Sequence, residues 1–259
     1  MICSVEKVIE NIEISKDIYK VSIKGNSEAV PGQFYMLKTT NEEPLLPRPI
    51  SVYDVSKNCI TFLYKVVGRG TELISRLKKD EEIQILGPLG NSFDRSKLKG
   101  KVALVSGGIG IAPLTFLTKR LENCSVDFYA GFCDYVYAVD NVEKNVNNLY
   151  ISTEKYANGN NCKNYTQKNN CTHVDNSYIT DIFDPSKYDI VVCCGPKIMM
   201  KKVVQMCKEK KVPIYVSMEN RMACGIGACL GCTCKTNEGN KRVCSEGPVF
   251  NGEDLILDE

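Results

Sequence analysis

The stretch "KVALVSGGIGIAPLTFLTKRLE", residues 101–122, decides the fold class of this chain. It begins as a continuous apolar run, which is typical of a strand that is buried on both faces of a sheet. The run ends in the glycines of "SGGIG", and "IAPLTFLTKRLE" then has the length and composition of a helix. A buried strand that passes through a glycine turn into a helix predicts a parallel α/β sheet.

The residues that follow repeat this alternation of strand and helix. The expected elements are the strands "SVDFYAGF" (125–132), "YDIVVCCGP" (188–196) and "PIYVSME" (213–219) and the helix "KIMMKKVVQMCKEKK" (197–211). We therefore predict a central α/β nucleotide-binding domain over residues 99–215.

An Asn- and Lys-rich segment at about 156–177 interrupts this pattern. It holds almost no aliphatic residue, so we predict a flexible surface insert. The only histidine of the chain, His173, lies within it. Catalysis by a histidine is therefore not expected.

Residues 1–98 are instead predicted to form an antiparallel β-barrel. Short apolar runs recur there between Gly, Pro, Asn and Asp residues, among them "YKVSIKG", "GQFYMLKT" and "EIQILGPLG". Short strands with regular turn signals are typical of a small barrel or sandwich. One helix is expected at 71–79, "TELISRLKK", with Thr71 as its N-cap.

Five of the fourteen cysteines gather in residues 216–259. Within "CGIGACLGCTC" (224–234) the spacing is C-x4-C-x2-C, and Cys244 follows, which is the plant-type pattern for a [2Fe–2S] cluster. The glycines between the cysteines let the backbone pass close to the cluster sulfides and direct N–H groups at them. We predict a small C-terminal [2Fe–2S] domain with the metal ligands Cys224, Cys229, Cys232 and Cys244.

A fifth cysteine, Cys234, competes for one of the four ligand positions. If residues 232–236 are extended, Cys232 and Cys234 share a face, so geometry alone does not exclude Cys234. The x4/x2 spacing selects Cys232, and we assign Cys234 to packing. A structural zinc site is an alternative, but such sites usually show two C-x2-C pairs and this segment holds one.

The composition limits the partners. The formal net charge of +2 gives no electrostatic case for nucleic acid binding. The sequence has no apolar run of transmembrane length, and its first residues are too charged for a signal peptide. We expect a cytoplasmic chain that binds neither nucleic acid nor membrane.

Four short stretches are candidates for binding phosphate groups. In the barrel region, Arg48 of "RPIS" could pair with a phosphate, and Gly70 and Thr71 of "GRGT" could offer N–H groups at a helix N-terminus. In the α/β region, two loops follow buried strands and precede helices, and a tight turn without a ligand is the alternative for each. Their candidate NAD-binding residues are Gly107, Gly108, Gly110, Cys194, Gly195 and Pro196. Two such loops at the carboxyl ends of strands mark the crevice where open α/β sheets bind ligands.

The order "RPIS", "GRGT", "GGIGIAP", "CGPKIMM" and "ACGIGACLGCTC…RVC" resembles the ferredoxin–NADP reductase superfamily. Within it, the chain is most similar to the electron-transfer subunits of class 1B dihydroorotate dehydrogenase, on "ENRMACGIGACLGCTCK" and "RVCSEGPVFNGEDL". The resemblance implies FAD contacts at Arg48, Pro49, Ile50, Ser51, Leu63, Tyr64, Lys65, Gly70 and Thr71. The stretch "STEKYANGNN" departs from the Asp-, Gly- and Ser-rich stretch usual in relatives.

The resemblance also implies a reaction and a partner. A catalytic subunit would oxidise dihydroorotate at an FMN, and electrons would pass through [2Fe–2S] to FAD and as a hydride to NAD⁺. The three electron-carrier domains occupy the 259 residues, so orotate is expected to bind a partner, in a heterotetramer of two copies of each subunit. The alternatives are a flavin/iron–sulfur subunit of a bifurcating transhydrogenase or sulfide dehydrogenase, and a zinc-stabilised interaction module without redox function.

Overall fold

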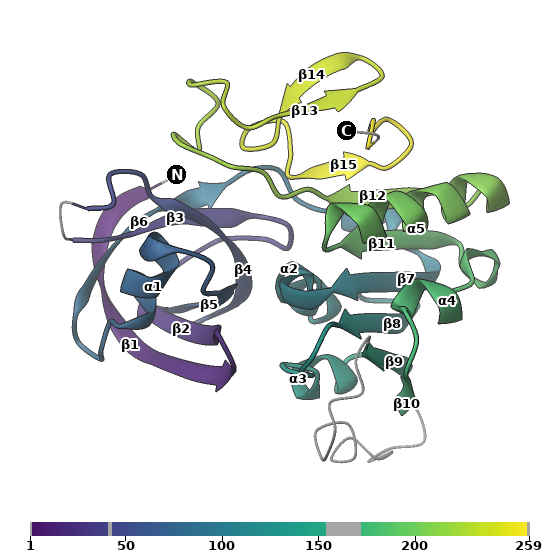
Figure 1. Cartoon of the computed structure of the whole chain (residues 1–259), viewed down its shortest axis with the longest axis horizontal. Helices are drawn as coiled ribbons and strands as arrows, with labels where there is room; N and C mark the ends of the chain where they lie inside the picture. The colour runs from purple at the N-terminus through teal and green to yellow at the C-terminus, as the bar shows by residue number, and fades with distance from the viewer. Residues whose placement is uncertain (1, 41–42, 154–171, 258–259) are drawn as a thin grey trace.

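The computed structural model describes residues 2–40, 43–153 and 172–257. A closed β-barrel forms one side of the molecule, a mostly parallel sheet forms the other, and a short β-hairpin lies above both (Figure 1). The predicted order of barrel, α/β part and C-terminal part is confirmed. The domain boundaries at residues 98 and 215 stay a prediction, since the chain of the last part also contributes a strand to the central sheet.

The barrel closes in the strand order β1-β2-β5-β4-β3-β6, and all its neighbouring strands are antiparallel. Its strands are β1 (Ile2–Ser15), β2 (Ile18–Lys24), β3 (Phe34–Thr39), β4 (Arg48–Ser56), β5 (Cys59–Lys65) and β6 (Glu82–Leu89). Alternating residues such as Val21, Phe62 and Ile83 fill the interior and are fully buried. Closure pairs every strand on both sides, which leaves no free barrel edge.

The barrel helix α1 (Arg69–Ser75) differs from its prediction. Its N-cap is Gly68, so the expectation of Thr71 as the N-cap is wrong. Thr71 is the third helical residue, and its hydroxyl accepts hydrogen bonds from the N–H groups of Val67 (3.0 Å) and Gly68 (3.3 Å). A Thr in the first turn whose hydroxyl accepts from preceding backbone N–H groups resembles an N-cap residue in the sequence. The N-cap was therefore predicted three residues after its observed position.

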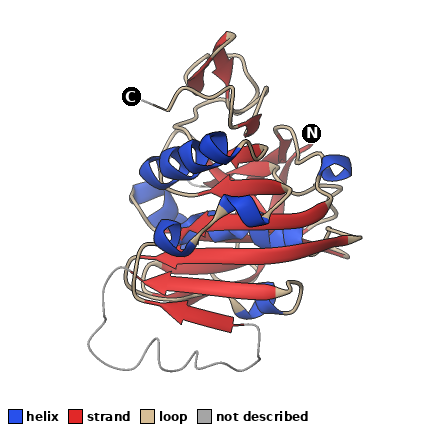
Figure 2. Ribbon diagram, turned by 90° about the vertical axis from the view of Figure 1, so that its right-hand side faces the viewer, coloured by secondary structure: helices blue, strands red, loops and turns tan. Residues whose placement is uncertain are grey.

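The central sheet has the order β10-β9-β8-β7-β11-β12-β15, and β15 alone runs antiparallel to its neighbour. The strands are β7 (Gly100–Gly107), β8 (Cys124–Phe132), β9 (Asn148–Thr153), β10 (Thr172–Asp175), β11 (Ile190–Cys194), β12 (Ile214–Ser217) and β15 (Val249–Asn251). Figure 2 shows these strands one above another. The strands and helices expected around β7, β8, β11 and β12 are all present.

The predicted insert at 156–177 ends differently from its prediction. Residues 154–171 lie outside the described residues. Thr172–Asp175 form the edge strand β10, parallel to β9, with His173 opposite Tyr150. The expectation of an irregular loop is therefore wrong for these last residues, because pairing with an exposed strand edge can order a segment that has few aliphatic side chains.

Helices cover both faces of the sheet and bury alternate residues of its strands. They are α2 (Ile111–Thr118), α3 (Asp140–Glu143), α4 (Ile179–Ile182) and α5 (Lys197–Lys210). Val102 and Leu104 of β7 pack with α2, whereas Ala103 and Val105 pack with α5. The chain moves outward from β7 to β10 and then returns to place β11 on the other side of β7. The strand order therefore reverses between β7 and β11, where α/β sheets form their binding crevice.

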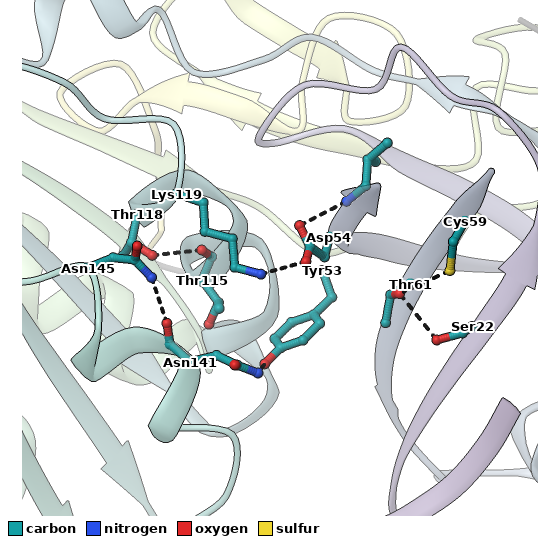
Figure 3. Close-up of polar contacts among 11 residues, drawn as sticks. Ser22, Tyr53, Asp54, Cys59, Thr61, Thr115, Thr118, Lys119, Asn141 and Asn145 are labelled. Atoms are coloured by element: carbon teal, nitrogen blue, oxygen red, sulfur yellow. Dashed lines mark hydrogen bonds and ion pairs between the residues drawn. The ribbon is translucent and has the colours of Figure 1, made fainter. Parts of the chain in front are cut away.

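The barrel and the α/β part pack directly against each other (Figure 3). Lys119, which follows α2, donates to Asp54 of β4 at 2.5 Å, and Asn141 of α3 donates to the Tyr53 hydroxyl at 2.8 Å. Phe116 of α2 is buried within the barrel's own hydrophobic cluster. This packing holds the two parts in one fixed relation.

The C-terminal part follows β12 and carries the hairpin of β13 (Thr233–Thr236) and β14 (Gly239–Arg242) before β15. Its Cys232, Val243 and Cys244 are buried in a hydrophobic cluster shared with the barrel and α5. No helix in the described part of the chain is long and apolar enough to cross a membrane.

Candidate functional site

The fold brings the predicted flavin-contact stretches together at one end of β4 and β5. Arg48–Ser51 begin β4 and Leu63–Lys65 end β5, and the two strands are antiparallel neighbours. The Arg48 guanidinium lies against Gly70, where an added Cβ would be 2.3 Å from the Arg48 Nε atom. The guanidinium therefore packs closely on Gly70, and its Nη1 atom donates to the Leu46 carbonyl at 2.6 Å.

Several side chains of these stretches are buried or hydrogen-bonded within the protein. Leu63 and Tyr64 are buried, and the Tyr64 hydroxyl donates to Asn11 at 3.3 Å. The Thr71 hydroxyl is buried and donates to the Gly68 carbonyl at 2.9 Å. A flavin would therefore contact the half-buried side chains of Arg48 and its neighbours. At Leu63, Tyr64 and Thr71 it would contact the backbone.

The two glycine-containing loops of the sheet touch each other, backbone against backbone. A Cβ at Gly110 would lie 2.3 Å from the Cys194 carbonyl oxygen, and one at Gly107 would lie 2.6 Å from Pro196. Gly195 has φ +158 and lies equally close to Gly107. Glycine is required here by close approach, as in loops that carry a pyrophosphate.

A cleft of about 980 Å³ opens at these loops, between the α/β part and the barrel. Gly107, Gly108, Gly195 and Pro196 line it from the sheet, and Lys65 lines it from β5. Gly110 and Cys194 lie behind this surface as a packed pair. The cleft therefore joins the predicted nucleotide loops to the end of the predicted flavin stretch.

The cysteine loop has the local backbone that a cluster requires. Gly225 (φ +71), Gly227 (φ +81) and Leu230 (φ +59) adopt left-handed conformations that curl the loop inward. The N–H of Gly227 donates to the Cys244 Sγ atom at 3.1 Å, and two further backbone N–H groups donate to thiol sulfurs. Hydrogen bonds of this kind stabilise thiolates and tune a cluster.

The four predicted ligands form two pairs. The Cys229 N–H donates to the Cys224 Sγ atom, and the Cys244 N–H donates to the Cys232 Sγ atom, both at 3.4 Å. Within the described residues, no three Cys, His, Asp or Glu side chains converge on a single ion position. Two pairs of thiols fit a cluster of two irons, in which each iron takes two thiolates.

Burial and hydrogen bonding act in opposite directions on these thiols. Burial opposes ionisation of Cys224, but hydrogen bonds from the N–H groups of Cys229 and Ile226 outweigh it and lower the pKa of Cys224 to about 6. Burial raises the pKa of Cys244 to about 11. Binding to iron would hold both as thiolates.

Cys234 takes a different position, in strand β13 opposite Lys241. It is partly buried against the shared hydrophobic cluster, and burial raises its pKa. The predicted ligand Cys244 shares both the burial and a raised pKa, so the assignment of Cys234 to packing stays a prediction that rests on the cysteine spacing.

The cysteine loop also contacts the barrel. A Cβ at Gly225 would lie 2.7 Å from Met36 of β3 and 3.1 Å from Leu89 of β6. Met36 pairs in register with Pro49 of the "RPIS" stretch on β4. One strand therefore separates the cysteine loop from the predicted flavin contacts.

Comparisons with known proteins agree with this arrangement. A family model described as the iron-sulfur cluster binding domain of dihydroorotate dehydrogenase B matches residues 219–256. The dihydroorotate dehydrogenase B (NAD(+)) electron transfer subunit of Clostridium acetobutylicum is 55% identical over 256 residues, with 99% of this chain and 98% of that protein covered. The same subunit of Clostridium perfringens is 48% identical over 250 residues, with 95% of each chain covered. The chain belongs to this family of electron transfer subunits.

Solved structures share the fold of this chain. The structure of an NADH-dependent reduced ferredoxin-NADP oxidoreductase is 26% identical with a TM-score of 0.82, covering 98% of this chain and 91% of that one. A ferredoxin NADP+ reductase from Neisseria gonorrhoeae, with bound FAD and NADP, shares the fold at 14% identity and a TM-score of 0.63, covering 85% of this chain and 94% of that one. The predicted resemblance is confirmed, and the family and fold support FAD, a [2Fe–2S] cluster and NAD as the cofactors.

Glu219 and Tyr137 are among the cleft residues of this electron transfer subunit that the sequence did not single out. Glu219 follows β12, and protein surrounds its carboxyl group, which raises its pKa, although water reaches it through the cleft. Among the described residues no ion pair partner faces it. Tyr137 stacks edge-on against Phe132 at 4.9 Å, close to the glycine loop. A carboxylate directly after a buried strand was the available signal for Glu219.

Proposed function

We propose that this chain carries electrons from the FMN of a catalytic dihydroorotate dehydrogenase partner, through [2Fe–2S] and FAD, to NAD⁺ in pyrimidine biosynthesis. Cys224, Cys229, Cys232 and Cys244 would hold the cluster, and the stretches around Arg48, Lys65 and Gly70 would hold FAD. FAD supplies the chemistry that converts single electrons into a hydride.

The observation that carries the proposal is the position of Met36. It contacts the cysteine loop at Gly225 and pairs with Pro49 at the predicted flavin site, while Lys65 of the same barrel end lines the nucleotide cleft. The three predicted cofactor sites are therefore consecutive, in the order that electron transfer needs.

The nucleotide loops have a role that their geometry supports. Gly107, Gly108 and Gly195 line the base of the cleft, and backbone N–H groups beside a helix N-terminus attract a pyrophosphate. The barrel wall and Lys65 close the other side of the cleft. A nicotinamide in this cleft would lie between the sheet and the flavin end of the barrel.

The partner would dock at the cysteine loop. Ile226 is 50% and Leu230 61% exposed, and Cys229 is exposed between them. Exposed apolar residues beside a redox centre suit a protein partner, because electron transfer needs the donor close to the cluster. We propose that this partner is the FMN-containing catalytic subunit and that two copies of each subunit assemble.

Within the described part of the chain, no cysteine is paired in a disulfide. The reducing cytoplasm keeps thiols in this form, which supports a cytoplasmic site of action.

The test uses the purified chain loaded with both cofactors. We expect it to oxidise NADH with an artificial acceptor and to leave dihydroorotate unchanged. Adding a class 1B catalytic subunit should give dihydroorotate-dependent reduction of NAD⁺. Turnover of dihydroorotate by this chain alone would refute the proposal, and coupling to ferredoxin instead of to that subunit would favour a bifurcating transhydrogenase.

We also propose a preference for NAD over NADP. No Lys or Arg occurs between Leu121 and Glu143, where a 2′-phosphate usually finds its partner, and Asp134 lines the cleft in this stretch. The ratio of kcat/KM for NADH and NADPH is the measurement, and equal values would contradict the preference.

A further inference from the structure

We propose that Arg242 raises the reduction potential of the cluster and that Glu246 fixes the position of the arginine. This inference rests on the proposed ligand set of Cys224, Cys229, Cys232 and Cys244. Neither Arg242 nor Glu246 is a ligand. Both act on the cluster through charge and through the backbone that surrounds it.

Arg242 ends strand β14, and its side chain turns toward the cysteine loop. Its Nη1 atom donates to the Gly227 carbonyl at 3.3 Å. The N–H of the same glycine donates to the Cys244 Sγ atom at 3.1 Å. A single residue, Gly227, therefore lies between the guanidinium and a ligand sulfur.

Glu246 holds this arginine at two points. Its Oε2 atom accepts from the Arg242 backbone N–H at 2.8 Å and from the Arg242 Nε atom at 2.9 Å. The Arg242 carbonyl in turn accepts from the N–H of Glu246 at 2.9 Å. One tight turn thus contains Arg242, the ligand Cys244 and the carboxylate that orients the guanidinium.

The cysteine loop fits closely against this turn. Gly227 has φ +81, and a Cβ there would lie 2.8 Å from the Ser245 hydroxyl. Glycine is needed both for the left-handed backbone and for the approach of the turn. The distance between the guanidinium and the ligand sulfurs is therefore set by packing, rather than by a flexible side chain alone.

The direction of the effect follows from charge. Reduction of a [2Fe–2S] cluster adds one negative charge, so a fixed positive charge nearby stabilises the reduced form and raises the potential. Arginine stays charged at every working pH. The Arg242 side chain is 38% exposed, so salt screens its charge in part, and the effect should shrink as ionic strength rises.

The experiment is an anaerobic redox titration of the FAD- and cluster-loaded chain, followed by the EPR signal of the reduced cluster. Arg242→Gln should lower the midpoint potential of the cluster and leave that of FAD in the same sample unchanged. Arg242→Lys keeps the charge, so its midpoint potential should lie between those of Arg242→Gln and the parent. A higher salt concentration should reduce the difference in midpoint potential between Arg242→Gln and the parent.

Lys241→Gln is the matched control. It removes the same charge from the neighbouring residue of β14, but Lys241 pairs with Glu238 in the turn of the hairpin. Its midpoint potential should match the parent. The proposal would be overturned if the midpoint potential of the cluster fell equally in Lys241→Gln and Arg242→Gln, or if it did not fall in Arg242→Gln.

If Arg242→Gln does not retain iron and sulfide, Glu246→Gln decides the matter. The Gln side chain keeps an oxygen that can accept from the Arg242 backbone N–H and Nε atom, so the arginine stays in place while a negative charge beside the cluster is lost. The midpoint potential of the cluster should therefore rise, and an unchanged or lower potential would overturn the inference. The parent protein separates this result from the proposed function. A parent without an EPR-active cluster would refute the ligand assignment, whereas a normal parent with unshifted variants would refute the role of Arg242 alone.

Discussion

The cysteine loop and the nucleotide cleft both depend on glycine, yet each uses it for a different purpose. In the cysteine loop, Gly225 and Gly227 have positive φ values that bend a short stretch of chain around its own thiols. In the cleft, Gly107 and Gly110 leave room for a second loop that lies far away in the sequence. One site is folded by local backbone conformation and the other by contact between distant strands.

This difference explains why the two sites were predicted with unequal detail. A loop that surrounds a metal cluster must carry its ligands at fixed spacing, so its chemistry is visible in consecutive residues. A cleft between strand ends takes residues from several elements, and their meeting depends on strand order. Four predictions test this contrast, from the largest expected effect to the smallest.

Loss of a single cluster ligand should have the largest effect. We expect Cys224→Ser, Cys229→Ser, Cys232→Ser and Cys244→Ser each to abolish the [2Fe–2S] cluster, because the local site has no spare thiolate in register. Cys234→Ser should retain it, since Cys234 packs in β13. Iron and acid-labile sulfide content is the measurement, and equal iron loss in Cys234→Ser would overturn the ligand assignment.

Gly110→Ala should disrupt the contact between the two loops at the cleft and leave the [2Fe–2S] cluster content unchanged. The added Cβ would meet the Cys194 carbonyl at 2.3 Å, so we expect a loss of about 1–3 kcal/mol in the free energy of unfolding and weaker NADH oxidation. Gly68→Ala is the control, since a Cβ there meets nothing within 4 Å. Denaturant unfolding compares the two variants, and NADH kinetics are measured for Gly110→Ala against the parent. Equal stability in the two would show that the loop contact is unimportant.

A smaller effect is expected from Glu219, which the sequence pattern did not reveal. The protein around the Glu219 carboxyl group raises its pKa although the residue is exposed to the cleft, so the folded state disfavours the ionised form. Its contribution to stability is present below the ordinary glutamate pKa and is lost as pH rises through the raised value. The Tm of Glu219→Gln minus that of the parent should therefore increase as the pH rises from about 4 to neutral.

The control for this pH dependence is Glu122→Gln, which changes an exposed glutamate that follows α2 and does not line the cleft. Its Tm difference from the parent should stay flat over the same pH range. A flat difference for Glu219→Gln as well would show that the carboxyl group is fully solvated in the cleft.

The smallest effect is expected at the contact between barrel and sheet (Figure 3). Asp54 and Lys119 form an ion pair whose side chains are 31% and 27% exposed. A double-mutant cycle with Asp54→Asn and Lys119→Met should give a coupling of about 0.5 kcal/mol, because water screens the pair. A coupling several times larger would mean that this pair, and not the apolar contact of Phe116, holds the two parts together.

Much of the fold was predictable because its patterns are local. The apolar run at 101–107, the helix at 197–210 and the alternating strands of the barrel each follow from residues close in sequence. The N-cap of α1 and the strand Thr172–Asp175 were predicted wrongly. The strand depends on a distant partner, because β10 needs the edge of β9. The N-cap error is local, because the Thr71 hydroxyl accepts from the N–H of Val67, four residues earlier, and so resembles an N-cap in the sequence.

The sequence by itself determined the cluster chemistry, the alternation of strands and helices, and the glycine loops at strand ends. Each of these depends on residue types at short spacing, where backbone conformation and ligand number leave few alternatives. Tertiary structure alone decided that Gly225 contacts Met36, that Glu219 enters the cleft, and that Gly227 links Arg242 to Cys244. These contacts join segments far apart in the chain, and their geometry is set by strand order and side-chain packing, which no local pattern encodes.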